Sequence, residues 1–479
     1  MNYSIIRYIL CWVLEFQALF LALPCIVAVC YGEKQGWMFL FVAVGCFAVG
    51  ALGRLKKAKS DVFYAREGFV TVSLSWIIMS LTGALPFFLT GEFDTYTDAL
   101  FETISGFTTT GASILSDVEA LSRCTMFWRC FTHWIGGMGV LVLILAVLPL
   151  AGGYNMYLMR AESPGPTVGK LVPRVRHTAR ILYEMYVLMT IVEIITLLLA
   201  GMPLYDSITL SFGTAGTGGF GLLNTGAAEY TATVQIILTV FMILFGINFN
   251  VYFLIRERKG LAALKHEEMR YYLGVIAVAI LLITVNVREF FTTIGETVRH
   301  VAFQVASIIT TTGFSTTDFN KWPEFSKFIL VILMFVGACA GSTGGGIKIS
   351  RVMIMAKLAK NEFSHLIHPK RVRQISLEKH VVTKETLRSI SVFFIAYTFI
   401  YAASVLLISL DNLDFTTNFT AVAATLNNIG PGLGMVGPTS NFSVYSDPAK
   451  YVLMFDMLAG RLELFPMLLL FAPSTWKRN

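Results

Sequence analysis

The sequence predicts an all-α polytopic membrane protein with four tandem pore repeats around a central pore and two extra transmembrane helices at the N-terminus. Three observations predict this class: the composition, the spacing of the apolar segments and an internal repeat. Of the 479 residues, 55% are hydrophobic and only 14% are charged. This balance excludes a soluble enzyme and a disordered chain. In a membrane protein the net charge of +7 is informative through the loops in which the basic residues lie, and we expect no nucleic-acid partner.

Ten apolar segments have the length that a helix needs to cross a bilayer, which is roughly 20 residues. They lie at 5–31, 36–53, 68–90, 127–150, 181–201, 232–255, 271–287, 327–347, 389–410 and 450–472. The first contains Arg7 near its start and is too long for the apolar core of a signal peptide, so we expect it to remain as an anchor. These segments predict ten spans, the first two of which precede the repeat.

Lysine and arginine residues concentrate in alternate loops between these segments. The basic loops lie at 54–66, 160–180, 256–270 and 357–388, and Lys477 and Arg478 follow the last segment. The loops between them are acidic or mixed. Because basic loops stay on the cytoplasmic side of a membrane, we expect both termini in the cytoplasm.

Four loops on the opposite side each hold a moderately apolar stretch that is too short to cross the bilayer and that ends in a glycine-containing turn. Aligning Gly111, Gly218, Gly313 and Gly430 gives intervals of 107, 95 and 117 residues. Self-similarity at a nearly fixed spacing indicates a repeated structural unit. We therefore divide the chain into two N-terminal helices at 1–60 and four pore repeats at 61–165, 166–260, 261–368 and 369–479.

The four turns predict a shared polar interior, because irregular backbone at membrane depth is tolerated only where it is buried in protein or lines a water-filled cavity. Glycine permits a positive φ and has no Cβ, so successive carbonyl groups can point the same way. Rings of carbonyls can replace the hydration shell of a potassium ion. The short helices would direct their partially negative C-terminal ends at the same place, which favours a cation over an anion.

A single Thr-Thr-Gly string is an ordinary turn and by itself indicates no function. Copies in four equivalent places favour the pore interpretation instead. We expect K⁺ to bind at Thr110, Gly111, Thr217, Gly218, Thr312, Gly313, Ile429 and Gly430, with Thr109, Thr311 and Asn428 at their flank.

The unit of span, short helix, Thr-Gly turn and span, repeated four times in one chain, resembles the Trk/Ktr/HKT superfamily of potassium transporters. The resemblance covers nearly the whole chain, and the two extra N-terminal spans make it most similar to the bacterial TrkH/TrkG branch. Members with serine at the first filter glycine tend to favour sodium, so Gly111 supports potassium. Departures from the pattern are Ala215 and Gly216 in the second repeat and Ile429 and Pro431 in the fourth.

The resemblance also implies the setting in which the protein works. It implies a multi-pass protein of the bacterial inner membrane, a pseudo-tetrameric pore within one subunit, and a homodimer surrounded by membrane lipids. It implies a cytoplasmic TrkA-type regulatory subunit, through which a nucleotide (ATP/ADP or NAD(H)) would act. No covalent cofactor is expected, and the metal ions are K⁺ in the filter.

A run of glycines interrupts the apolar segment at 327–347. Each glycine costs a helix roughly 1 kcal/mol relative to alanine, so several together predict a break in the span. A phosphate-binding loop is disfavoured because the lysine does not directly follow the last glycine, and close helix packing stays an alternative. The run resembles the family's intramembrane gate in the third repeat, here Gly341, Ser342, Thr343, Gly344, Gly345, Gly346 and Lys348.

Arg461 lies in the last apolar segment, where an unpaired charge costs at least about 2.5 kcal/mol, so it should face a partner or the water-filled path. Glu463 is two positions away and does not share its helical face, so we expect no pair between them. In the family, the arginine of the matching Gly-Arg-Leu-Glu segment restrains the gate loop, which implies the same role for Arg461. A structural hydrogen bond to helix carbonyls is the alternative.

Two further groups of polar residues have simpler interpretations. Arg129 and His133 stand four residues apart in the segment at 127–150, and we expect them to anchor the structure rather than react. His365 and His368 lie in the basic cytoplasmic stretch and predict a solvated surface for a partner, with metal binding as the alternative.

We therefore predict a potassium uptake protein and not an enzyme. The nearest alternative is a symporter that couples K⁺ to H⁺ or Na⁺, which would need an intramembrane carboxylate such as Glu102, Asp456 or Glu463. A more distant alternative is a membrane-embedded lipid-modifying enzyme, but the sequence offers no acid, base or metal constellation for it at membrane depth.

Overall fold

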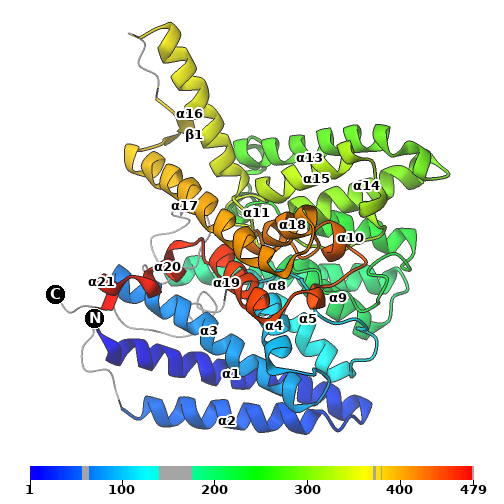
Figure 1. Cartoon of the computed structure of the whole chain (residues 1–479), viewed down its shortest axis with the longest axis vertical. Coiled ribbons are helices and arrows are strands. Elements are labelled where there is room, and N and C mark those ends of the chain that lie inside the picture. Colours follow the sequence, from blue (N-terminus) through cyan, green and yellow to red (C-terminus); the bar gives the residue numbers. More distant parts are fainter. Residues whose placement is uncertain (57–63, 140–174, 370–373, 379, 477–479) are drawn as a thin grey trace.

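The computed structural model describes residues 1–56, 64–139, 175–369, 374–378 and 380–476, and these residues are mostly helical (Figure 1). Among them, strand occurs only as an antiparallel hairpin of β1 (Ser376–Leu377) and β2 (His380–Val381). Six of the described helices are long and apolar enough to cross a membrane, and one bent helix pair would make a seventh. The predicted class, an all-α polytopic membrane protein, is confirmed.

The first two helices, α1 (Tyr3–Tyr31) and α2 (Gly36–Arg54), form a hairpin along one side of the molecule (Figure 1). Small residues let them approach closely, since a Cβ on Gly50 would lie 2.8 Å from the carbonyl oxygen of Cys11. The turn between them reaches helix α5 (Arg123–Met138). There the Glu33 carboxylate accepts hydrogen bonds from the backbone N–H groups of Arg123 and Cys124, at 2.7 and 2.9 Å, and caps that helix.

Four units follow, each made of a long helix, a short helix, a turn and a second helix. They are α3 (Ala65–Leu89), α4 (Tyr96–Phe107) and α5; α8 (Val175–Leu199), α9 (Leu204–Gly216) and α10 (Ala232–Phe245); α13 (Glu267–Asn286), α14 (Ile294–Ile309) and α15 (Glu324–Val336); and α17 (Lys384–Ile408), α18 (Phe415–Leu426) and α19 (Asp447–Arg461). Three short helices begin at polar caps, because the side chains of Thr95, Thr293 and Asp414 accept hydrogen bonds from the backbone N–H three residues later. The order of elements matches the predicted repeat, and its exact boundaries stay predictions.

In the second, third and fourth units, the helix that follows the turn is not continuous. Helix α10 bends by 89° into α11 (Phe249–Arg256), α15 stops before the segment 337–348, and α19 is followed after a short break by α20 (Phe465–Phe471). The continuous spans predicted at 232–255 and 450–472 are therefore wrong, whereas the break predicted in 327–347 is confirmed. In the first unit α5 ends at Met138, and residues 140–150 of the predicted span lie outside the described residues.

Local chemistry explains the two breaks that the apolar pattern did not predict. The Asn248 side chain accepts a hydrogen bond from Asn250 N at 2.9 Å and so starts α11 in a new direction. At the other break, Glu463 and Leu464 have positive φ values of 56° and 68°, and Pro466 starts α20 where its missing N–H is not needed. None of these residues interrupts the apolar pattern enough to predict a break from composition.

Helix α16 (Ile349–Ile367) was not predicted, and it projects away from the other helices (Figure 1). It carries His365 near its end, and both His365 and His368 are exposed, as expected for a solvated surface.

The two ends of the chain lie together, because Tyr3 Oη donates a hydrogen bond to the Trp476 carbonyl at 3.4 Å. The remaining short elements are α12 (Gly260–Leu264), α21 (Pro473–Trp476) and the 3-10 helices η1 (Arg288–Phe290), η2 (Phe319–Lys321), η3 (Ser409–Asp411), η4 (Gly434–Val436) and η5 (Phe442–Val444).

Buried aromatic side chains hold the first short helix in place. Trp128 of α5 is fully buried, and its ring forms a T-shaped contact with the ring of Phe107 at the end of α4, with 6.0 Å between the ring centroids. Its indole N–H donates to the Gly83 carbonyl of α3 at 3.1 Å. One side chain therefore joins the three helices of the first unit and fixes where its turn begins.

Candidate functional site: a ring of four turns above a glycine-rich segment

The four short helices end in three-residue turns that share one backbone shape. The first residue has a positive φ although it is not glycine, and the third is a glycine with a positive φ. The φ values are 55°, 54°, 59° and 55° at Thr109, Thr217, Thr311 and Asn428, and 77°, 80°, 89° and 100° at Gly111, Gly219, Gly313 and Gly430. Because non-glycine residues rarely adopt positive φ, its recurrence at four equivalent places indicates that the surroundings hold the backbone in this shape.

Backbone hydrogen bonds fix the register of the turns. In each turn the middle residue donates its N–H to the carbonyl five residues earlier at 2.8 Å: Thr110 to Ser105, Gly218 to Gly213, Thr312 to Ser307 and Ile429 to Ala424. Gly219, and not Gly218, is therefore the counterpart of the other three glycines. The alignment predicted for the second repeat is wrong by one residue, because two consecutive glycines follow Thr217 and composition does not distinguish them.

The turns meet in a closed ring. A Cβ built on each glycine would lie against the carbonyl oxygen of the middle residue in another turn: Gly111 against Gly218 at 2.0 Å, Gly219 against Thr312 at 1.9 Å, Gly313 against Ile429 at 2.1 Å, and Gly430 against Thr110 at 2.8 Å. These contacts run from the first turn to the second, third and fourth and back to the first. Only glycine allows this approach, so the carbonyl of each middle residue packs directly against the glycine of another turn.

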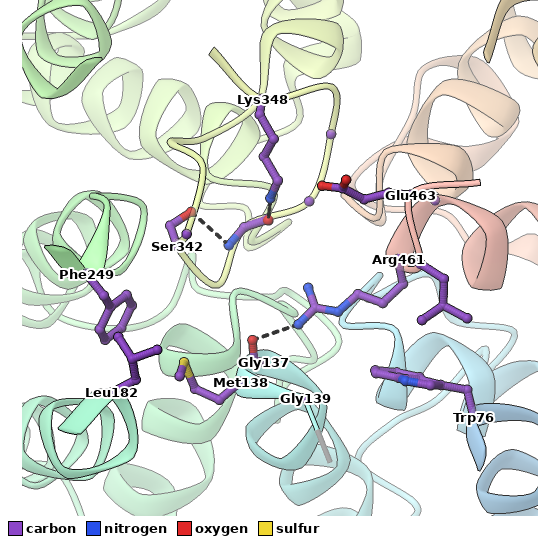
Figure 2. Close-up of a pocket in the computed structure, with 16 residues that line it drawn as sticks. Trp76, Gly137, Met138, Gly139, Leu182, Phe249, Ser342, Lys348, Arg461 and Glu463 are labelled. Atoms are coloured by element: carbon purple, nitrogen blue, oxygen red, sulfur yellow. Dashed lines mark hydrogen bonds between the residues drawn. The ribbon is translucent and has the colours of Figure 1, made fainter. Parts of the chain in front are cut away.

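Two cavities lie near this ring, and we call them outer and inner according to the orientation that the basic loops predict. The outer cavity is lined by the four glycines with positive φ and by residues that follow them, including Ser113 and Asn224. Beside it, the Asn224 amide and the Glu119 N–H donate hydrogen bonds to the Asp117 carboxylate and lower the pKa of that carboxyl group. The inner cavity is lined by the glycine-rich segment and Arg461 (Figure 2).

Side chains tie the turns to each other. In the first and third turns the hydroxyls of Thr110 and Thr312 each hydrogen-bond the threonine two residues earlier, at 2.8 Å in both. In the irregular fourth turn Asn428 stands where the other turns have threonine. Its amide nitrogen donates to Thr110 Oγ1 at 3.0 Å and to the Met457 carbonyl at 2.9 Å. The fourth turn is therefore bound to the first turn and to α19.

The glycine-rich segment 337–348 packs directly against the ring. Gly345 N donates to Thr311 Oγ1 at 2.6 Å. A Cβ on Gly345 would lie 2.4 Å from the Asn427 carbonyl oxygen, and one on Gly344 would lie 2.9 Å from the Thr310 carbonyl oxygen. The segment therefore reaches the third and fourth turns only because it has no side chains at these positions.

Arg461 connects this segment to the first unit (Figure 2). Its Nη1 donates to the Thr343 carbonyl at 2.9 Å and to Thr109 Oγ1 at 3.1 Å. Its Nη2 donates to the Gly137 carbonyl at 2.7 Å and also to the Gly136 carbonyl at the end of α5. The expected contact with the loop and the alternative, hydrogen bonds to helix carbonyls, are thus both present, and the restraining role stays a prediction.

Further charged groups surround the inner cavity. Lys348 is buried and has a φ of 78°. Its Nζ donates a hydrogen bond to the Gly344 carbonyl within the same segment. Arg351 of α16 pairs with Glu463 at 2.5 Å. Glu463 thus has an ionic partner on a helix far away in the sequence, in keeping with the expectation that it does not pair with Arg461.

Glu268 supports the glycine-rich segment, a role that the sequence pattern did not predict. Its Oε1 accepts a hydrogen bond from Ala340 N at 2.7 Å, and its Oε2 accepts one from Asn248 Nδ2 at 3.1 Å. The Gly341 carbonyl in turn accepts from Phe249 N at 3.0 Å. Glu268 precedes a predicted span and lies in a basic loop, where an acidic residue gives no signal of burial.

Arg129 and His133 do anchor the ring from behind. The His133 ring hydrogen-bonds the Gly106 carbonyl at 2.8 Å through Nδ1 and accepts from Phe220 N at 3.2 Å through Nε2, which assigns the neutral imidazole with its proton on Nδ1. Among the described residues, no group of three or more His, Cys, Asp or Glu side chains could hold a metal ion. The contacts of the turns are made by backbone carbonyl groups and by the hydroxyl groups of threonine.

Comparisons with known proteins agree with this geometry. A family model described as TrkH, cation transport protein, matches residues 37–478. The chain is 36% identical over 463 residues to the Trk system potassium uptake protein TrkH of Escherichia coli, with 95% of each chain covered, and 35% identical over 462 residues to TrkG of the same organism, covering 95% of this chain and 94% of that one. It is also similar to the crystal structure of the potassium transporter TrkH from Vibrio parahaemolyticus, with a TM-score of 0.89, 31% identity and full coverage of both chains.

Proposed function

Because the chain belongs to the TrkH family of cation transport proteins, which are transporters rather than enzymes, we propose that it takes up potassium ions through the ring of four turns. The single observation that carries this proposal is the closed cycle of glycine-to-carbonyl contacts between neighbouring turns. Crowded carbonyl oxygens can replace the water around a monovalent cation. The potassium ion is the transported substrate, and its ligands would be oxygens of Thr110, Gly111, Thr217, Gly218, Gly219, Thr312, Gly313, Ile429 and Gly430.

The segment 337–348 is proposed to be the gate. The bonds of Gly345 to Thr311 and of Thr343 to Arg461 support this role, because they hold the segment against the ring on the inner side. Opening would require these bonds to break and the segment and Arg461 to move aside. The gate residues are then Gly341, Ser342, Thr343, Gly344, Gly345, Gly346, Lys348 and Arg461.

The setting of this activity is proposed from the family. The relatives are named as parts of a Trk system, which supports a complex with a TrkA-type nucleotide-binding regulatory subunit. We also propose a homodimer in the bacterial inner membrane with both termini in the cytoplasm, which fits the hydrogen bond between Tyr3 and Trp476. Any nucleotide would act through the regulatory subunit.

Flux through the reconstituted protein tests the proposal. The full-length chain in liposomes should take up rubidium, with potassium competing far better than sodium. Protein-free liposomes prepared in parallel are the control. Absence of cation uptake, or equal competition by potassium and sodium, would refute a potassium-selective pore.

Coupled symport with H⁺ or Na⁺ is the second candidate, and one observation favours it. Asp456 in α19 is fully buried; one carboxylate oxygen accepts from Ser404 Oγ at 2.7 Å, and the other has no hydrogen-bond partner among the described residues. Intramembrane carboxylates often carry coupling protons. The other two carboxylates considered, Glu102 and Glu463, are ion-paired. A reversal potential that moves with an imposed pH gradient would favour symport, and one that follows potassium alone would favour a channel.

A further inference from the structure

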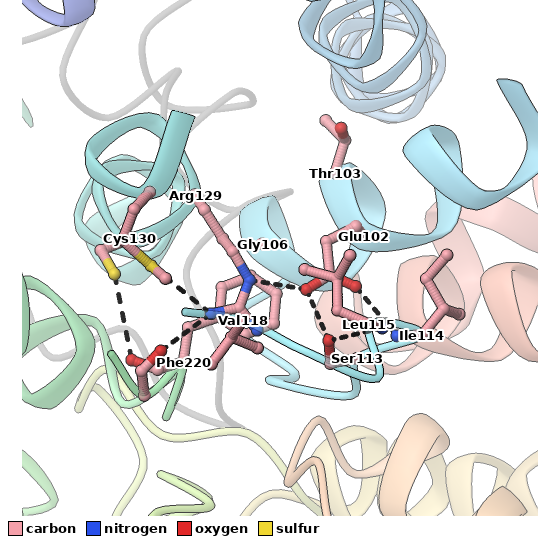
Figure 3. Close-up of polar contacts among 12 residues, drawn as sticks. Glu102, Thr103, Gly106, Ser113, Ile114, Leu115, Val118, Arg129, Cys130 and Phe220 are labelled. Atoms are coloured by element: carbon pink, nitrogen blue, oxygen red, sulfur yellow. Dashed lines mark hydrogen bonds and ion pairs between the residues drawn. The ribbon is translucent and has the colours of Figure 1, made fainter. Parts of the chain in front are cut away.

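A buried ion pair lies behind the first and second turns of the ring (Figure 3). Arg129 of α5 and Glu102 of α4 are 2% and 0% exposed, and Arg129 Nε lies 2.7 Å from Glu102 Oε1. Both charges are inside the protein, where desolvation is costly and a pair adds little stability compared with apolar residues of the same size. The contacts of this pair, rather than its stability, suggest what it does.

Glu102 holds the segment that leaves the first turn. Its Oε1 accepts a hydrogen bond from Ser113 Oγ at 2.8 Å, and its Oε2 accepts one from Ile114 N at 3.0 Å. These residues follow Gly111 by two and three positions. Because Arg129 also binds Oε1, both carboxylate oxygens are occupied, and the backbone after Gly111 is fixed to the helix that precedes the turn (Figure 3).

Arg129 extends the same network to the second turn. Its Nη1 donates to the Gly221 carbonyl at 3.0 Å, and its guanidinium group lies 3.6 Å from the centroid of the Phe220 ring. Phe220 and Gly221 directly follow Gly219. One helical turn further along α5, His133 accepts from Phe220 N. A single face of α5 therefore fixes the segments that leave two neighbouring turns.

No other repeat has a carboxylate at the position that corresponds to Glu102. The register of the turns places Glu102 nine residues before its glycine, and the corresponding residues are Leu210, Gln304 and Ala421. The side chains of leucine and alanine cannot accept hydrogen bonds. The most similar side chain is that of Gln304, but its Nε2 donates to Thr316 Oγ1 at 3.5 Å, which is at the limit of a hydrogen bond. In the third and fourth units neutral hydroxyl groups hold the segment that leaves the turn: Ser307 Oγ donates to the Phe314 carbonyl at 2.5 Å, and Thr420 Oγ1 accepts from Leu433 N at 2.8 Å. Among the described residues, the first and second turns therefore differ from the other two in being held by a buried ion pair.

We propose that Arg129 and Glu102 are positioning residues that set ion selectivity by holding the outer ends of the first and second turns at a fixed separation. The proposal rests on the proposed potassium pore. Discrimination between two cations of equal charge depends on how many oxygens surround the ion and how far they can move. Without the pair, the segments after Gly111 and Gly219 could shift apart, and the ring would accept a smaller, more strongly hydrated cation.

The test is the ratio of potassium to sodium permeability, measured as a reversal potential with K⁺ on one side of a planar bilayer and Na⁺ on the other. This ratio does not depend on how many pores are open or how much protein inserts, so a purely structural role would leave it unchanged. The main variant combines Glu102→Gln with Arg129→Gln, which avoids an uncompensated buried charge. The expected result is a ratio that falls by about tenfold or more, the equivalent of one lost hydrogen bond to a charged group.

A matched control uses a second ion pair on the same short helix. Lys450 pairs with Asp98 at 2.6 Å near the start of α4, away from the turn. The combination Asp98→Asn with Lys450→Met should leave the ratio as in the parent protein. Loss of selectivity in both double variants would mean that any disturbance of α4 has this effect, and it would overturn the proposal.

A conservative variant decides the matter if the main one does not fold. Arg129→Lys keeps the charge beside Glu102, but its single ammonium group cannot also reach Gly221, so the ratio should fall to an intermediate value. A parent-like ratio in the folded Glu102→Gln/Arg129→Gln protein, or in Arg129→Lys if the double variant does not fold, would overturn the proposal. A parent protein that itself fails to prefer potassium would instead refute the proposed function.

Discussion

Replacing Arg461 by glutamine should open the gate. Of the four hydrogen bonds described for its guanidinium group, three go to Thr109 and the end of α5, and one goes to the Thr343 carbonyl of the segment 337–348. The bond to Thr343 joins Arg461 to the segment, so it must break when the segment separates from Arg461. A hydrogen bond to a charged group contributes about 1.5–3 kcal/mol, so its loss should raise the ratio of open to closed pores by roughly 10- to 150-fold.

The assay is the initial rate of rubidium uptake into liposomes that contain the protein without any regulatory subunit, supported by open probability in planar bilayers. Arg256→Gln is a matched control, since Arg256 forms an exposed pair with Glu184 at 3.1 Å, and surface pairs contribute about 0–1 kcal/mol. Basal uptake should rise in the first variant and stay unchanged in the control. Uptake that stays the same or falls in Arg461→Gln would show that this bond does not keep the pore closed.

Two further predictions concern glycines. Gly345→Ala should also raise basal uptake, because its Cβ would lie 2.4 Å from the Asn427 carbonyl oxygen and would push the segment from the ring, whereas Gly274→Ala, in open space, should have no effect. Gly219→Ser should lower the potassium-to-sodium permeability ratio in bilayer recordings, because the new Cβ would lie 1.9 Å from the Thr312 carbonyl oxygen at a φ of 80°.

Each of these glycine predictions has a clear contrary result. Closed, parent-like behaviour in Gly345→Ala would mean that the segment accommodates a methyl group without leaving the ring. An unchanged permeability ratio in Gly219→Ser would mean that the second turn does not contribute to selectivity.

Much of the architecture is predictable from the sequence because the bilayer imposes simple rules. Apolar segments of span length predicted the long helices, and three Thr-Gly strings with a fourth glycine turn at Gly430 predicted four short helices that end in turns. The break at 337–348 was also predictable, since so many glycines oppose a helix. Arg461 could be singled out because a charge among apolar residues requires a partner.

The identity of the partners was decided by the tertiary structure. Gly218 and Gly219 are equivalent in composition, and only contact with the third turn shows which one closes the ring. The breaks after α10 and α19 follow from a cap at Asn248 and from positive φ at Glu463 and Leu464, which leave little trace in an apolar pattern.

The sequence by itself determined which residue types repeat and how far apart they stand, because hydrophobic length and glycine content are local properties. Tertiary structure decided that Arg129 binds Glu102 and Gly221, residues that lie 27 and 92 positions away. The physical reason is that a hydrogen bond depends on separations of about 3 Å in space. Residues far apart in the chain reach such separations only once all four units have packed together.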